Sequence, residues 1–180
     1  MIIHMKRRGF TIIELIIVVT IMGILLTIGV VNLRGSQANG RDAERKVDVD
    51  TIALHLETYY TSGIDGTAHT ASYPSTALTA TTASMIQYLR DIDTKSITAP
   101  GVTDPTLTFI SATNNTQTTA GVLPQPTINQ YVYQPLQNDG TLCTLNTQEC
   151  RKFNLYYKLE NATTDCPAPN NICMITSKNQ

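Results

Sequence analysis

The sequence is poor in charge and contains no tryptophan. Of its 180 residues, 15% are Asp, Glu, Lys or Arg, and the formal net charge is −1. Proteins that bind a polyanion such as DNA need clustered Lys and Arg, and this composition offers no excess of them. We therefore expect no nucleic-acid partner. A chain of this length is expected to form one domain with an attached element.

The sequence also lacks the patterns of common catalytic centres. Histidine is limited to His4, His55 and His69, and there is no G-x-S-x-G, H-E-x-x-H or paired Cys and His pattern. His55 has no second ligand at metal spacing on its helix, so we interpret it as a surface residue. We predict that the protein is not an enzyme and that it uses no cofactor and no metal.

Charge is scarcest in residues 10–31, F-T-I-I-E-L-I-I-V-V-T-I-M-G-I-L-L-T-I-G-V-V, where Glu14 is the one charged residue. A helix of this length spans roughly the 30 Å hydrocarbon layer of a membrane. Lys6, Arg7 and Arg8 precede the run, and the positive-inside tendency keeps them cytoplasmic, so that everything after residue 31 faces outward. A secretory signal peptide would have a shorter apolar core and an A-x-A cleavage site, which is missing here.

A plain membrane anchor leaves Glu14 unexplained, because an ionised side chain at mid-bilayer costs about 2.5 to 3.5 kcal/mol. The basic leader, the motif G-F-T-x-x-E and the apolar run resemble the class III signal of type IV pilins and of the pseudopilins of type II secretion. The resemblance implies that residues 1–9 are a leader, which a prepilin peptidase removes by cutting between Gly9 and Phe10. Phe10 would then become the N-methylated first residue of the mature chain.

The resemblance also gives Glu14 a partner. Cleavage creates an α-ammonium on Phe10, which is cationic near neutral pH because the reference pKa of such a group is about 7.7 to 8.0. In the family's filament model, this ammonium pairs with the glutamate of a neighbouring subunit, so Glu14 would fix the register of assembly. From the residues alone, Glu14 can also be stabilised by the helix dipole and by its own N-terminus. We favour the assembly role, and the two roles are compatible.

Residues 32–62 continue as an amphipathic helix. One face carries Val49, Ile52, Ala53, Leu56, Tyr59 and Tyr60, and we expect it to bury against a globular head. Val47 and Leu54 lie seven residues apart on the opposite face, either as scattered exposed residues or as a contact between subunits. The helix also holds a group of charged residues that we expect to form a solvated face, with contacts between subunits as the other interpretation: Arg41, Asp42, Glu44, Arg45, Lys46, Asp48 and Asp50.

The same helix contains glycines but lacks proline, because the first proline of the chain is Pro74. Each glycine in a helix interior costs about 0.8 to 1 kcal/mol relative to alanine. Small residues in a membrane helix also allow close packing. Close packing and local melting therefore both remain open for these positions, Gly23, Gly29, Gly35 and Gly40.

The remaining residues predict a head in two parts. Residues 63–128 are rich in Ser and Thr, with one short helix predicted from Leu78, Met85, Ile86 and Leu89. Residues 129–180 predict an antiparallel sheet: Y-V-Y-Q-P-L and T-L-C-T-L form a hairpin around N-D-G, F-N-L-Y-Y-K-L-E alternates, and C-M-I-T-S supplies a last strand. We therefore predict an α+β fold, in which a long N-terminal helix packs on a small antiparallel sheet.

Cysteine is absent before residue 143 and then occurs four times, in C-T-L-N-T-Q-E-C and C-P-A-P-N-N-I-C. An even number of cysteines in an exported domain indicates disulfides, and four allow three connectivities. We favour Cys143–Cys150 and Cys166–Cys173, because each closes a short loop, although spacing alone leaves crossed pairing open. A zinc site is the rival interpretation, but the C-x6-C spacing is wide for zinc.

From these features we predict a structural subunit of a type IV pilus, first held in the cytoplasmic membrane by one span and then part of an extracellular filament. The alternatives are a pseudopilin of a secretion or competence system and a minor pilin or adhesin of low copy number. The expected partners are copies of the chain in a helical homopolymer, the prepilin peptidase, the assembly ATPase with its platform, and the membrane. Cleavage leaves 10 basic against 14 acidic side chains, which gives no electrostatic case for DNA.

Overall fold

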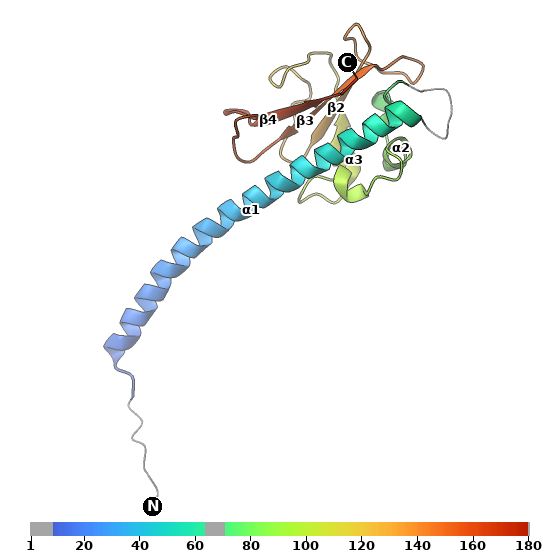
Figure 1. The fold of residues 1–180 in the computed structure, drawn as a ribbon. Coiled ribbons are helices and arrows are strands. Elements are labelled where there is room, and N and C mark those ends of the chain that lie inside the picture. The colour runs from blue at the N-terminus through green and yellow to red at the C-terminus, as the bar shows by residue number, and fades with distance from the viewer. Residues whose placement is uncertain (1–8, 64–70, 180) are drawn as a thin grey trace, which may run out of the picture. The chain divides into compact units, whose positions relative to one another are not determined.

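The computed structural model of the chain describes residues 9–63 and 71–179. The chain divides into two compact units, with the boundary between Ala38 and Asn39. One long helix belongs to both units and is followed by short helices and a sheet in the second unit (Figure 1). The elements are α1 (Ile12–Ser62), η1 (Thr76–Thr79), α2 (Thr82–Tyr88), η2 (Thr94–Ile97), α3 (Pro105–Thr108), β1 (Phe109–Ser111), β2 (Tyr131–Leu136), β3 (Lys152–Lys158) and β4 (Ile172–Thr176).

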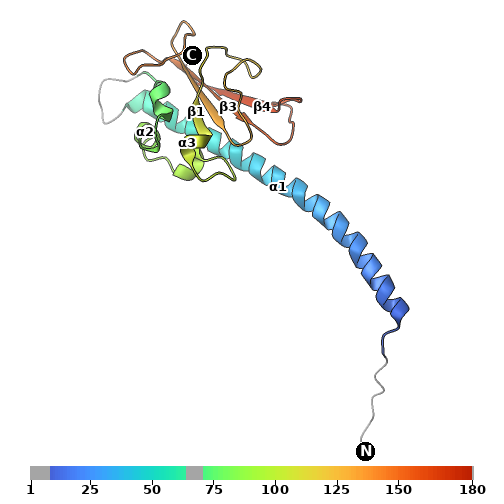
Figure 2. The same cartoon turned by 180° about the vertical axis from the view of Figure 1, so that it is seen from behind.

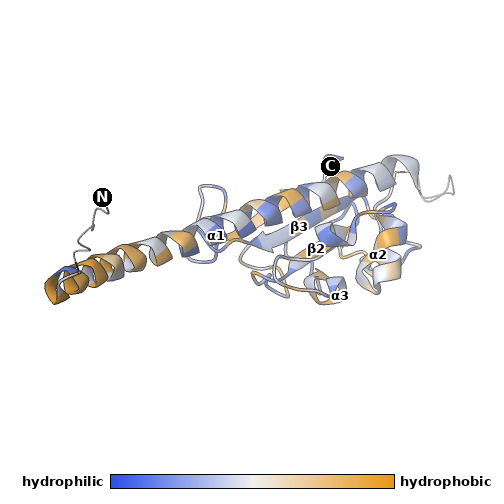
Figure 3. Ribbon diagram, turned by 90° about the horizontal axis from the view of Figure 1, so that it is seen from below, coloured by the Kyte–Doolittle hydropathy of each residue, from blue (hydrophilic) through white to orange (hydrophobic). Residues whose placement is uncertain are grey.

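The part of α1 in the first unit is mostly apolar from Ile12 to Val30, and Figure 3 shows this end of the helix in the hydrophobic colour. By length and composition this helix can cross a membrane, a test that a signal sequence near the N-terminus also passes. Its two threonines do not leave free hydroxyl donors, because Thr20 and Thr27 bond to the carbonyls of Ile17 at 2.8 Å and Ile24 at 2.7 Å. Satisfying polar groups inside the helix is what a hydrocarbon environment requires.

In the second unit, α1 has one buried face. Val49, Ile52, Leu56 and Tyr59 are buried, and the first three pack in a core with residues of the sheet and of the short helices. Figure 2 shows α3 beside β1 in this unit. The face predicted from helical periodicity is therefore confirmed.

The sheet has the order β1-β2-β3-β4, with β2, β3 and β4 antiparallel and β1 parallel to β2. The α+β class is confirmed, but the sheet is mixed, and the predicted strand T-L-C-T-L is wrong. The turn at N-D-G does form, with one isolated bridge, Leu136 to Leu142, and backbone hydrogen bonds from Gln137 to Thr141 and from Cys143 to Pro135, but β2 pairs along its length with β3. The reason is that residues 143–150 form a loop closed by a disulfide between Cys143 and Cys150. A second disulfide joins Cys166 to Cys173.

All six residues of β2 are buried, because both faces of the sheet are covered. Tyr131 and Tyr133 enter the main core, whereas Val132 joins a second cluster on the other face. Buried Gln134 uses its whole amide group: its nitrogen bonds to the carbonyls of residues 114 and 116, and its oxygen accepts from the side chains of Asn154 and Tyr156. A fully bonded buried amide favours one strand register over its neighbours.

The predicted short helix is split in two. Leu78 lies in η1 and Met85 in α2, and Leu89 caps the end of α2. The division falls at Thr81, whose side chain accepts a hydrogen bond from the backbone N–H of Ser84 and so starts a new helix.

Two leucines on opposite faces of α1 give a direct test of this packing. We expect Leu56→Ala to lower the free energy of unfolding by about 2 to 5 kcal/mol, because it leaves a cavity in the main core. Leu54→Ala is the matched control on the exposed face and is expected to change it by less than about 0.5 kcal/mol. Urea denaturation of the full chain in detergent, followed by circular dichroism, measures both values. Equal effects of the two substitutions would contradict the assigned faces.

Candidate functional site

Three charged residues of α1 are buried in the head, contrary to the expectation of a solvated face. Asp42, Arg45 and Asp48 are 7%, 1% and 5% exposed, whereas Lys46 and Asp50 on the same helix are exposed. The expectation was wrong for the first three because their partners come from segments more than 80 residues away in the sequence. Local charge patterning carries no information about such partners.

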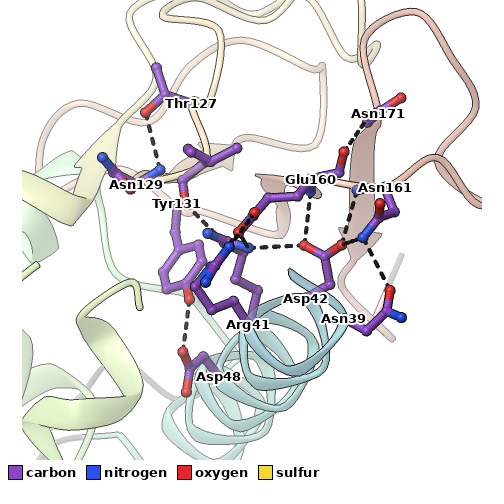
Figure 4. Close-up of polar contacts among 12 residues, drawn as sticks. Asn39, Arg41, Asp42, Asp48, Thr127, Asn129, Tyr131, Glu160, Asn161 and Asn171 are labelled. Carbon is purple, nitrogen blue, oxygen red and sulfur yellow. Dashed lines mark hydrogen bonds and ion pairs between the residues drawn. The ribbon is translucent and has the colours of Figure 1, made fainter. Parts of the chain in front are cut away.

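Asp42 and Arg45 belong to a cluster that we call the α1 clamp, consisting of Arg41, Asp42, Arg45, Glu160 and Asn161 (Figure 4). Arg41 binds both carboxylate oxygens of Glu160, at 2.7 Å from Nε and 2.6 Å from Nη2. Arg45 Nη1 bonds to Asp42 at 2.9 Å and to Glu160 at 3.0 Å. The Asp42 carboxylate accepts the backbone N–H groups of Glu160 at 2.8 Å and of Asn161 at 3.0 Å. The clamp thus fastens α1 to the turn that follows β3.

The electrostatics of the clamp favour charged side chains. The hydrogen bonds from Arg41 lower the pKa of Glu160 to about 2, against a smaller opposing effect of burial. Stability from this group is fully present above its ordinary pKa of 4.5 and is lost as the pH falls toward 2. Arg45 also donates from Nε to the carbonyl of Ile128 at 2.8 Å, so the clamp reaches the segment before β2 as well.

Asp48 is in the opposite situation. Burial raises its pKa to about 6, and a hydrogen bond from the Tyr131 hydroxyl at 2.7 Å only partly offsets this. The other charged groups that act on it are Glu44, which raises the pKa, and Lys95 and Arg45, which lower it. The same burial raises the pKa of Tyr131 well above its ordinary value. Asp48 is therefore a carboxyl group that binds a proton more readily in the folded head than in the unfolded chain.

A third tie lies further along α1. Glu57 accepts hydrogen bonds from the Tyr73 hydroxyl at 2.9 Å, the backbone N–H of Lys178 at 2.8 Å and the side chain of Asn179 at 2.9 Å. It joins the segment after β4 to the helix. Across residues 9–63 and 71–179, no three His, Cys, Asp or Glu side chains are grouped as metal ligands.

The N-terminal residues singled out in the sequence form a helix cap. Thr11 directly precedes α1, and its N–H and hydroxyl both bond to Oε2 of Glu14, at 2.9 and 2.7 Å. In return, the Glu14 N–H bonds to the Thr11 hydroxyl at 3.3 Å. This reciprocal pattern is a capping box. Sequence reasoning did not identify Thr11, although the spacing T-x-x-E at residues 11–14 is its signature.

Gly9 and Phe10 lie outside the helix, in an exposed segment. Apart from its chain neighbours, no atom of the described residues lies within 4 Å of a Cβ placed on Gly9. The bond between these residues therefore lies in the exposed segment that precedes the cap residue Thr11. Lys6, Arg7 and Arg8 lie outside the described residues.

Residues 4–30 match the prokaryotic N-terminal methylation motif. This motif is the class III signal peptide of type IV pilins and pseudopilins. The chain therefore carries the signal of a type IV pilin-like or pseudopilin precursor, a structural rather than an enzymatic class. No curated protein and no solved structure matches the chain.

The methylation motif places the apolar unit of α1 in a precursor that is anchored in a membrane before assembly. The capping box holds the carboxylate of Glu14, the one acidic group of the apolar segment, at the start of α1. The clamp belongs to the other unit, beyond the matched residues. The two features thus lie on different parts of α1: the methylation motif at its beginning and the polar attachment to the head in its second half.

Asp48 yields a prediction about pH. Its folded pKa of about 6 exceeds the ordinary 3.8, so its contribution to stability is fully present below about pH 4 and is lost as the pH rises through 6. We expect Asp48→Asn to raise the free energy of unfolding at pH 7.5 by about 1 to 2 kcal/mol and to bring no gain at pH 4.

Urea denaturation at the two pH values measures this difference. Asp50→Asn, on an exposed position of the same helix, is the control and should change neither value. A destabilised Asp48→Asn protein at pH 7.5 would instead mean that the ionised carboxylate contributes to the fold.

Proposed function

We propose that the chain is the structural subunit of a type IV pilus, which assembles through α1 into an extracellular filament. The observation that carries the proposal is an exposed apolar helix that lies within the methylation motif at residues 4–30. Between residues 12 and 30, its large apolar side chains are 41–81% exposed. Such a surface is unfavourable in water and needs either a bilayer or other apolar helices around it.

Maturation would begin in the membrane. The prepilin peptidase cuts between Gly9 and Phe10 on the cytoplasmic side, where Lys6, Arg7 and Arg8 hold the leader. Methylation of Phe10 then keeps the positive charge of the new N-terminus. The extended, uncrowded backbone at Gly9 supports this assignment, because a protease needs close access to an unfolded segment. The assembly ATPase and its platform would then move the subunit from the bilayer into the filament.

Glu14 would act as the assembly residue. In the single chain, both donors of Thr11 converge on Oε2, so the capping box stabilises the carboxylate before a partner arrives. In the filament, the ammonium of Phe10 from a neighbouring copy would bind the same carboxylate. The pair neutralises two charges in a low-dielectric environment, and a buried pair of this kind specifies register more than it adds stability.

The exposed face of α1 in the head supports a second contact between copies. We call it the outer seam; it consists of exposed Val47, Leu54 and Thr61 and half-buried Thr51 and Thr58, and successive members are spaced alternately by four and three residues. Its threonine hydroxyls bond to carbonyls of their own helix, so they need no outside partner. A spacing of 3.5 residues on average is that of a helix packed along another helix.

The outer seam would pack against an α1 of a neighbouring copy. That contact would join the outer seam of one copy to a different surface on α1 of the next copy. A heterologous contact of this kind generates an open helical filament when its rotation does not close into a ring. A pseudopilin of a secretion or competence system would share the motif and the contact. A minor pilin or adhesin would share them at low abundance. The composition of filaments separates these alternatives.

The central test is to shear cells, collect filaments and identify the principal protein by mass spectrometry. We expect this chain to dominate by mass and to begin with N-methylated Phe10. We expect Glu14→Ala to be processed and to reach the membrane but to yield no filaments, because the ammonium of the neighbour loses its counterion. Asp50→Ala, a change at an exposed acid of the head, is the control. A mature chain that retains Gly9, or normal filaments with Glu14→Ala, would refute the proposal.

The outer seam is tested by the double substitution Val47→Ala and Leu54→Ala. We expect filament yield to fall at least about tenfold, a change of 1.4 kcal/mol or more per contact, while the free energy of unfolding of the subunit stays unchanged. Leu145→Ala is a matched control, because Leu145 is 60% exposed and Leu54 62%. Sheared-filament yield and urea denaturation are the two readouts. Equal yields from the double variant and the control would exclude the seam as an assembly contact.

A further inference from the structure

The α1 clamp stands where the helix first meets the rest of the head. Going along α1 from the unit boundary, the first residues bonded to other segments are Asn39, Arg41, Asp42, Glu44 and Arg45, of which Glu44 makes an exposed ion pair with Lys95. The apolar core contacts of the helix begin later, with Val49. A force directed along α1 therefore reaches polar, directional bonds before it reaches the apolar core.

The bonds of the clamp act in parallel and on two separate segments. Arg41 and Asp42 connect the helix to the turn after β3, and Arg45 adds the carbonyl of Ile128 before β2. Bidentate arginine–carboxylate pairs are among the strongest hydrogen-bonded contacts in proteins. They are also short in range, because a hydrogen bond is lost beyond about 3.5 Å between its heavy atoms. Sliding of α1 by a fraction of a helical turn would have to break several of them together.

A gain in the free energy of folding does not by itself explain why the ion cluster of the α1 clamp is buried. Arg45 is 1% exposed and shares its charge with two carboxylates. Replacing a buried ion cluster of this kind with apolar residues is often neutral or stabilising, whereas removing one partner is costly. The clamp is therefore better suited to resisting displacement than to increasing the free energy of folding.

We propose that the α1 clamp is a mechanical latch, which holds α1 against the head when the helix is pulled along its axis. The source of that tension rests on the proposed function, since a filament subunit is loaded through α1. The latch itself is a property of the single subunit. Its failure and the failure of the filament assignment can therefore be observed separately.

Single-molecule force spectroscopy of the full chain in a detergent micelle tests the latch. Peptide handles at the two ends of the chain place α1 in the path of the force. We expect Glu160→Gln to speed unfolding of the head at constant force at least about tenfold. Arg41→Gln, which removes only the bidentate pair at a half-exposed side chain, should give a smaller rise. Glu149→Gln, which removes an exposed ion pair with Arg151, is the matched control and should have no effect.

A second pulling geometry separates a latch from general stabilisation. With one handle in the exposed loop at Asn115 and the other at the end of the chain, the force crosses the sheet and bypasses α1. We expect the effect of Glu160→Gln to be at least about threefold smaller in this geometry, a difference of about 0.65 kcal/mol in the barrier. Equal acceleration in both geometries, or none when α1 is pulled, would overturn the proposal.

Discussion

The structure depends on one constraint: residues 12–30 of α1 form an apolar helix with a single carboxylate, and this segment has no face suited to water. A soluble helix offers one apolar stripe to a core, but here every side of the segment is apolar. Its large side chains are exposed within its own unit. Membrane storage and assembly are two ways of meeting the same requirement, and the methylation motif at residues 4–30 joins them in one precursor.

In both units, threonine hydroxyl groups of α1 donate hydrogen bonds to backbone carbonyls of the helix itself. Thr20 and Thr27 return their hydroxyl hydrogen bonds to the helix backbone in the apolar unit. Thr51 and Thr58 do so on the outer seam. A threonine used in this way presents no free donor to its surroundings. The repetition suggests that the outer seam and the apolar segment suit similar neighbours, namely other helices rather than water.

Sequence patterns gave α1, its buried face and the assembly motif, since each rests on information within a few residues. They failed for Arg45 and Asp48, whose partners Glu160 and Tyr131 are distant in sequence. They also placed a strand at residues 141–145, where local alternation resembles a hairpin but a disulfide loop takes the chain away from β2. The parallel strand β1 has three residues, too few to show a period. The capping box was available in the sequence, because Thr11 and Glu14 have the required spacing.

The head attaches to α1 at successive points along the helix: at the clamp, at Asp48 with Tyr131, and at Glu57 with the segment after β4. Points of attachment at different heights prevent both sliding and rotation of the helix within the head. The outer seam lies on the face opposite the buried one, so its direction relative to the sheet is fixed as well. A contact surface with a fixed direction imposes the same rotation at every addition of a subunit. Repetition of one rotation and one rise is the definition of a helical filament, so in the proposed filament the polar interior of the head would contribute to the regularity of the polymer and the apolar helix to its cohesion.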